Sequence, residues 1–198
     1  GEPNMVKLTV QSVNNKSANQ LLFDALNWYI LILNDFKHTL NRTQMVSVHP
    51  KDRDPDLKMQ WIQTDTSMKN ACELDILNET HTIGNLLSTF CKLLYLEKRE
   101  DAIASNTLDF VSYNMPHPLK KNIKIRMKLN DELANETFKK MRPEIAPLAH
   151  ISQQRNHVCM VLLSECIDHI CKKYLTPMSV AIQKADPAIT ETRSFKVV

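Results

Sequence analysis

Hydrophobic residues recur at two different spacings along this chain, and the change of spacing separates expected strands from expected helices. Residues 6–13 alternate apolar and polar side chains, which is typical of a half-buried strand. Over 19–40 the apolar residues recur every three or four positions, which predicts an amphipathic helix capped by Ser17 or Asn19. One strand cannot cover so broad a stripe. We therefore expect a second helix or a partner to contact Leu22, Leu26, Tyr29, Leu33 and Phe36.

The rest of the chain predicts two pairs of strands, each pair followed by a helix. The polar segment 41–56, with its two prolines, is interpreted as a linker. Strands are expected over 57–63, 71–77, 107–113 and 122–129, amphipathic helices over 82–96 and 148–174, and a short helix over 130–141. This order predicts an α+β fold, in which two long amphipathic helices cover one face of a small antiparallel sheet.

The expected organisation has four parts. A leading strand and helix occupy 1–40, the linker follows over 41–56, the main domain spans 57–175, and an irregular tail closes the chain over 176–198. Methionine first occurs at position 5, just before the first strand. Either four residues precede the natural start, or the chain is a fragment of a longer protein.

Composition narrows the class of protein. The chain has 198 residues and a net charge of +3, which is too weak to indicate nucleic-acid binding by itself. Its five cysteines form no CxxC pair, and neither a signal peptide nor a continuous apolar run of membrane length occurs. These features predict a soluble protein from a reducing compartment that makes no contact with membranes.

The segment ETHTIGNLLSTF contains Gly84, one of only two glycines in the chain. It lacks the second glycine and the Lys-Ser/Thr pair of a phosphate loop. His81 lies near Glu79 and could act as a base, but no nucleophile occurs in an activating motif. We therefore favour a packing or capping role for His81 at the strand-to-helix turn. Gly84 is expected to let another backbone or helix approach closely.

Two further groups of residues could bind a metal ion or nucleic acid. Cys166 and His169 are three residues apart on a predicted helix and could share a metal, although buried cysteines and a surface histidine explain them equally simply. A basic cluster follows a proline-rich turn. On a strand, its alternate members would form an ordinary solvated face or, in the alternative reading, a nucleic-acid-binding module: Lys120, Lys121, Lys124, Arg126 and Lys128.

Two sequence blocks carry a resemblance to a known family. NACELDILNETHTIGNLL and DFVSYNMPHPLKKNIKIRM resemble the small α-like subunit of multisubunit RNA polymerases, over about residues 57–175. The matching positions are Asn70, Ala71, His81, Thr82, Gly84, Asn85, Tyr113, Pro116, His117 and Pro118. Glu79-Thr80 departs from the family's Glu-Asp, and 130–150 looks inserted.

The front of the chain resembles a second family member. LTVQSVNN and the following helix are similar to the end of the large α-like subunit, although Gln11 and Asn14 replace the family's Glu and Gly. The two subunits are separate chains in cells, and some large cytoplasmic DNA viruses fuse them. The resemblance therefore implies a viral fusion, or a diverged viral subunit, located in the virion and the host cytoplasm. A cellular member would be nuclear.

The resemblance implies a scaffold without catalytic residues, cofactor or metal. Its expected partners are a large α-like subunit or a fused upstream domain, and the two largest polymerase subunits, with DNA and RNA reached only through the complex. The broad apolar helices fit such obligate association. The expected interface comprises His81, Thr82, Ile83, Gly84, Asn85, Leu86, Leu87, Phe90, Leu94, Tyr113, Pro116, His117, Pro118, Val158, Leu162 and Ile170.

Overall fold

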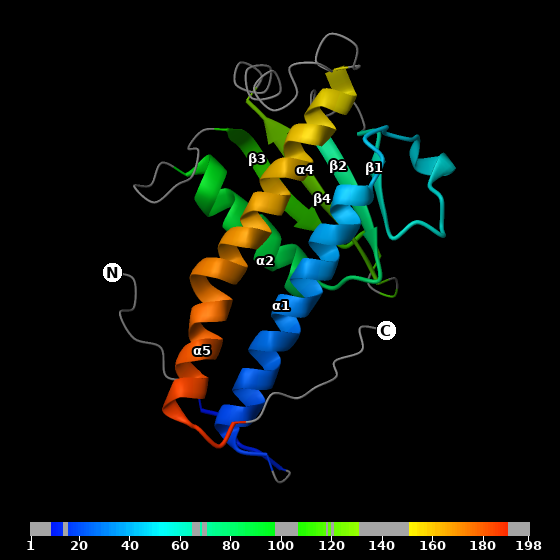
Figure 1. The fold of residues 1–198 in the computed structure, drawn as a ribbon. Helices are drawn as coiled ribbons and strands as arrows, with labels where there is room; N and C mark the ends of the chain where they lie inside the picture. The colour runs from blue at the N-terminus through cyan, green and yellow to red at the C-terminus, as the bar shows by residue number, and fades with distance from the viewer. Residues whose placement is uncertain are drawn as a thin grey trace. The chain divides into compact units, whose positions relative to one another are not determined.

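A computed structural model describes residues 9–13, 16–64, 68, 71–97, 107–117, 119, 121–130 and 151–189 (Figure 1). The chain divides into two compact units. One combines 1–34 with 169–198, and the other spans 35–168. The short helix expected over 130–141 lies outside the described residues except for its first position, Asn130, which is not helical. No helix in the described ranges is both long and apolar enough to cross a bilayer.

The larger unit contains a four-stranded antiparallel sheet in the order β1-β2-β4-β3. Its strands are β1 (Met59–Ile62), β2 (Ala71–Leu77), β3 (Leu108–Asn114) and β4 (Asn122–Leu129). These agree closely with the predicted strands, except that β1 is shorter. With its helices, this sheet confirms the predicted α+β class.

Alternation along each strand gives the sheet two different faces. The first face is apolar and forms the core with residues such as Trp61, Leu74 and Ile125, which are almost completely buried. We call this the helix face. Two helices cover it, α2 (His81–Cys91) and α4 (Ile151–His169) (Figure 1). The hydroxyl of Tyr95 donates to the carbonyl of Leu162 at 3.1 Å and so ties the end of the first helical segment to the second.

The opposite face of the sheet, here called the outer face, is polar but also largely buried. Glu73 and Asp75 of β2 lie on this face, yet they are only 4% and 7% exposed. The reason lies in the segment 41–56, which was interpreted as a linker. It forms a parallel bridge between Val48 and Ile62 at the edge of the sheet and includes a short 3-10 helix, Pro50–Asp52. Arg53, which follows, pairs with the carboxylate of Asp75.

Helix α1 (Ala18–Arg42) confirms the predicted amphipathic helix, and its bounds contain residues of both units. The hydroxyl of Ser17 accepts from the backbone N–H of Gln20 at 3.1 Å, so Ser17 is the capping residue and Asn19 lies inside the helix. Phe36 and Leu40 are fully buried in the larger unit.

The strand expected over 6–13 is wrong where the structure describes it. Residues 9–13 form no strand, and Val10 and Val13 are exposed. Alternation provides two faces, but a strand also needs a neighbour for its backbone hydrogen bonds, and none is found for 9–13 among the described residues.

The irregular tail expected from residue 176 is also wrong at its start. A π-helical segment, Ile170–Leu175, is followed by α5 (Thr176–Ala185). The backbone N–H of Thr176 donates to the carbonyl of Cys171, five residues earlier. This wider turn lets the chain stay helical around Pro177, which sequence reasoning takes as a helix end. A similar π-helical segment, Lys92–Leu96, follows α2.

Candidate partner interface and polar pocket

The turn between β2 and α2 places the glycine motif at the surface of the larger unit. Asn78 has a positive φ of 59°, and its N–H donates to the carbonyl of Lys121 at 2.6 Å. Thr80 occupies the N-cap position in an extended conformation without a side-chain capping bond. His81 then begins the helix, exposed to solvent, with its ring 5.9 Å from that of Tyr113 in an edge-to-face arrangement.

Gly84 is required by a neighbour within the same chain. A Cβ atom at this position would lie 2.4 Å from Cδ2 of Tyr113 and 2.9 Å from Cγ. Side chains essentially never approach so closely, so the ring of Tyr113 occupies the space that alanine would need. A close approach by another backbone or helix was expected, and the structure places a strand side chain there instead.

His81 receives no support as a catalytic base. The neighbouring carboxylate of Glu79 is 3.5 Å from the ammonium of Lys58, and its side chain is only 10% exposed. Burial raises the pKa of Glu79, while Lys58 opposes that shift. The acid that sequence reasoning paired with His81 therefore belongs to a structural ion pair.

The expected interface residues fall into three groups. Those exposed are His81, Thr82, Asn85, Pro116 and His117. Those half-buried are Leu86, Phe90 and Tyr113. Those buried inside the chain are Ile83, Gly84, Leu87, Leu94, Val158, Leu162 and Ile170, whereas Pro118 lies outside the described residues. Buried side chains are already covered by the chain itself, so direct contact with a partner is restricted to the other two groups and stays a prediction for them.

The smaller unit carries an apolar surface that sequence reasoning missed. The first part of α1 is joined to α5 by hydrogen bonds from Ser179 to Asn27 at 3.1 Å and from Asn19 to Asp186 at 3.1 Å. In the described helical segments of this unit, five large apolar residues remain at least one-third exposed: Trp28, Leu31, Tyr174, Met178 and Val180. We call them the exposed helix surface. Trp28 and Leu31 are three residues apart, a spacing that places both on one side of α1 and could have indicated a second apolar face.

The residues expected to pair through α1 are buried or half-buried. Leu26 and Leu33 are buried, while Leu22 and Tyr29 are half-buried. Phe36 belongs to the core of the larger unit. The predicted stripe therefore forms internal contacts, and a partner of α1 would meet Trp28 and Leu31 instead.

Ion pairs within the sheet hold the basic side chains of β4 in place. Lys124 and Arg126 both bind the carboxylate of Glu73, the lysine at 2.7 Å, and Lys128 binds Asp109 at 2.6 Å. Burial raises the pKa of Glu73, but its hydrogen bonds to the two bases outweigh this effect and hold the pKa below the ordinary value. Three of the five expected basic residues thus have acidic partners, which does not favour the nucleic-acid alternative. Lys121 is exposed, and Lys120 lies outside the described residues.

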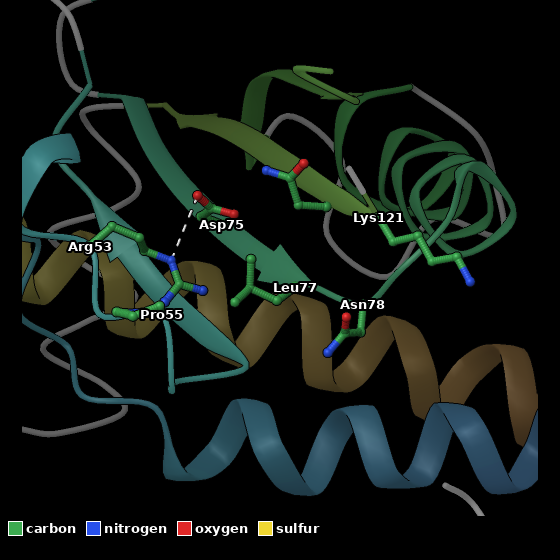
Figure 2. A pocket seen from close by; sticks show the side chains of 7 residues that line it. Arg53, Pro55, Asp75, Leu77, Asn78 and Lys121 are labelled. Carbon is green, nitrogen blue, oxygen red and sulfur yellow. Dashed lines mark ion pairs between the residues drawn. The ribbon is translucent and has the colours of Figure 1, made fainter. Parts of the chain in front are cut away.

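A pocket of about 400 Å³ opens on the outer face, where β2 ends and β4 begins (Figure 2). It is lined by Arg53, Pro55, Asp75, Leu77, Asn78, Lys121 and Asn122. Figure 2 shows the guanidinium of Arg53 pointing toward Asp75, and the two groups are 3.7 Å apart. Burial raises the pKa of Asp75 against the opposing influence of Arg53 and Lys124. No sequence motif indicated this pocket, because its walls come from the presumed linker and from two distant strands.

The cysteines form buried pairs in the core. The thiol of Cys159 on α4 contacts Cys72 of β2, and that of Cys166 contacts Cys91 at the end of α2. Burial and the contact with Cys72 raise the pKa of Cys159. In the described part of the chain, no three His, Cys, Asp or Glu residues are grouped to hold a metal. Cys166 and His169 therefore gain no third ligand there.

An antiparallel four-stranded sheet covered on one face by two helices defines a small α+β domain with a polar outer face. No family model matches the chain. Over 67 residues, the chain is 40% identical to DNA-directed RNA polymerase II subunit rpb11 of Dictyostelium discoideum. The match covers 34% of this chain and 47% of that protein, so it spans about half of the curated relative. This similarity supports a relationship to a small RNA polymerase subunit, and the α+β fold is consistent with that relationship.

Proposed function

We propose that this chain is a non-catalytic assembly subunit of a DNA-dependent RNA polymerase. The partial match to an RNA polymerase II subunit is the observation that carries the proposal. In this role, the chain pairs with an α-like partner, either a separate large α-like subunit or a fused upstream domain. The pair then provides the platform on which the two largest subunits assemble, and nucleic acid is contacted only through the complex.

Two surfaces supply contacts for such assembly. The first is the exposed helix surface, whose large apolar side chains are each at least one-third exposed and would be buried by a partner. The second is the turn at His81, Thr82 and Asn85, which is exposed and polar. Interfaces between permanent subunits are typically apolar at their centre with a polar rim, and these two surfaces offer both components.

The finer proposal is that the polymerase is viral. Its support is the resemblance of residues 8–15 and the following helix to the end of a large α-like subunit, in front of the rpb11-like region. Such an order of segments corresponds to a fusion of the two subunits. The corresponding locations are the virion and the host cytoplasm, whereas a cellular counterpart would act in the nucleus.

Co-purification tests the proposal. The chain carries an affinity tag and is expressed in cells that make its native transcription machinery, and recovered proteins are identified by mass spectrometry. We expect two very large polymerase subunits in the eluate. Their absence from the wild-type eluate, or recovery of nucleic acid alone, would refute the assembly role.

Variants then locate the interface. Leu31→Asp and Met178→Asp place charges on the exposed helix surface, while Val46→Asp changes an equally exposed residue of the larger unit. We expect the first two to lose the large subunits and the third to retain them, with unchanged circular dichroism in all three. Leu87 is unsuitable for this test because it is fully buried, so an aspartate there would disrupt the core. Retention by both surface variants would exclude this surface.

A further inference from the structure

The pocket on the outer face contains an unusual set of polar atoms. Within the described residues, four buried side-chain nitrogen or oxygen atoms have no hydrogen-bond partner, and three of them belong to residues that line this pocket. They are Nε of Arg53, Oδ1 of Asp75 and Oδ1 of Asn122. Because buried polar groups are normally paired, three such atoms at one pocket indicate a place where a ligand completes the bonding.

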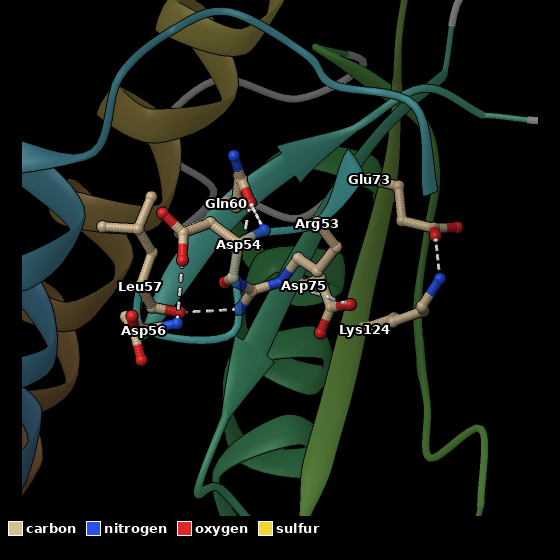
Figure 3. A network of polar contacts seen from close by, with 8 residues as sticks. All are labelled: Arg53, Asp54, Asp56, Leu57, Gln60, Glu73, Asp75 and Lys124. Carbon is tan, nitrogen blue, oxygen red and sulfur yellow. Dashed lines mark hydrogen bonds and ion pairs between the residues drawn. The ribbon is translucent and has the colours of Figure 1, made fainter. Parts of the chain in front are cut away.

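Arg53 is held by hydrogen bonds of both terminal nitrogens, while its buried inner nitrogen, Nε, has no hydrogen-bond partner. One terminal nitrogen donates to the carbonyl of Leu57 at 2.8 Å, and the other donates to the carbonyl of Asp54 (Figure 3). Its Nε lies 3.7 Å from Oδ2 of Asp75, which is an ion-pair distance but too long for a hydrogen bond. The neighbouring segment is itself held in place, since the N–H of Asp54 donates to Oε1 of Gln60 at 2.9 Å.

The two acceptors are positioned by the sheet. Asp75 is opposite Lys124 in the pairing of β2 with β4, and Asn122 is two residues before that lysine. Side chains two residues apart on a strand share a face, so Asn122 and Asp75 are diagonal neighbours on the outer face. A hydrogen bond with Asn122 contributes to lowering the pKa of Asp75 against the effect of burial, which agrees with this proximity.

The residues that line the pocket therefore contribute one unpaired donor and two unpaired acceptors, all three of them buried. A matching ligand group needs one acceptor and two donors, which is the hydrogen-bonding pattern of a primary carboxamide. A carboxylate has no donor for Asp75 and Asn122, and a guanidinium or ammonium has no acceptor for Arg53. We propose that this pocket binds a primary carboxamide group, with its oxygen on Arg53 and its NH₂ on Asp75 and Asn122.

The remaining walls suit the carbon chain that carries such a group. Pro55 and Leu77 contribute apolar surface, and Lys121 and Asn78 lie at the other end of the pocket (Figure 2). A volume of about 400 Å³ exceeds the carboxamide itself and leaves room for several attached carbons. The carboxamide has two sources, namely the side chain of a glutamine or asparagine in another polypeptide and a free amide such as glutamine. The site does not depend on the proposed polymerase role.

Titration of the ¹⁵N-labelled chain with small probes tests the proposal by nuclear magnetic resonance. We expect propionamide to cause saturable shifts at Asn78 and Asn122, and propionate and propylammonium to bind about tenfold more weakly or not at all. Equal binding of the three probes, or no saturable shift with any of them, would overturn the proposal. The latter outcome means that water alone completes the hydrogen bonds.

Variants and a second pair of probes sharpen the result. Asn122→Leu removes one acceptor and is expected to weaken propionamide binding about tenfold, whereas Asn122→Asp keeps an acceptor and retains binding. Asp109→Asn changes another outer-face acid outside the pocket and should bind as the wild type does. Wild-type affinity in Asn122→Leu, with a well-dispersed spectrum, would contradict the assignment. Binding of a capped Gly-Gln-Gly peptide but not free glutamine indicates a polypeptide source, and the reverse indicates a free amide.

Discussion

Gly84→Ala tests the contact between the glycine motif and β3. The substitution adds one methyl group to the first turn of α2. In an ordinary exposed helix, this change stabilises a protein by about 1 kcal/mol, because alanine is a better helix former than glycine. Here the new Cβ would lie 2.4, 2.9 and 3.0 Å from three atoms of the Tyr113 ring.

The expected magnitude follows from those distances. Ordinary contacts between carbon atoms are about 3.5–4.0 Å, so the ring or the helix must move by about 1 Å. The ring cannot avoid the methyl group by swinging its far end, because the contact includes Cγ, the atom that attaches the ring to the side chain. Overpacking of this kind costs about 1–3 kcal/mol. After the gain in helix propensity is subtracted, Gly84→Ala should destabilise the chain by about 1 kcal/mol.

A double-mutant cycle with Tyr113→Ala isolates the effect. Urea unfolding, followed by circular dichroism, gives the free energy of unfolding for the wild type, the two single variants and the double variant. We expect Gly84→Ala to lower stability in the wild type and to raise it by about 1 kcal/mol when Tyr113 is absent. A similar increase in both backgrounds would show that the ring exerts no steric constraint and would refute the reasoning.

Three further predictions concern the buried acids of the larger unit and the hydrogen bond between its two helical segments. Glu73→Gln should lower the free energy of unfolding by about 1–3 kcal/mol at neutral pH, since it leaves two basic side chains without their charged partner, and urea unfolding measures this loss. Tyr95→Phe should cost about 1 kcal/mol by the same assay, because it removes the buried hydrogen bond to Leu162. Stability should also change with pH in two opposite steps. Folding raises the pKa of Asp75 and Glu79, so stability should increase as these groups take up protons on acidification from neutrality. Folding lowers the pKa of Glu73, so its contribution is present above 4.5 and is lost as pH falls through the lowered value. Urea midpoints that decrease steadily from neutral pH downward would contradict this order.

Much of the fold was predictable because it depends on local periodicity. The bounds of β2 and β4 agree with the alternating segments, and α1 agrees with the run of apolar residues at helical spacing. The α+β class followed from the order of these elements. Prediction was less successful at the end of the last helical region, where the backbone changes from α-helical to π-helical hydrogen bonds. The tail from residue 176 was predicted to be irregular, whereas the chain continues as α5 after a π-helical turn that accommodates Pro177.

The candidate site was less predictable than the fold. Sequence spacing identified the motif around Gly84 but predicted another backbone or helix as its close neighbour, while the structure places the Tyr113 side chain there. It also interpreted apolar helix residues as a partner surface, although side chains such as Leu87 and Leu162 are used in the chain's own core. Periodicity shows which side of a helix is apolar, but it does not show what covers that side.

The sequence by itself determined the periodicity of each element, the α+β class and the position of the glycine motif. The tertiary structure alone decided which charged residues are neutralised and where the polar pocket forms. Arg53 lies in a segment without strand or helix periodicity, yet it reaches Asp75 across the sheet. Asn122 lines the same pocket as these two residues because β4 pairs with β2, although more than forty residues separate the two strands along the chain. Such contacts depend on long-range strand register, whereas helix and strand patterns arise from neighbours only a few residues apart.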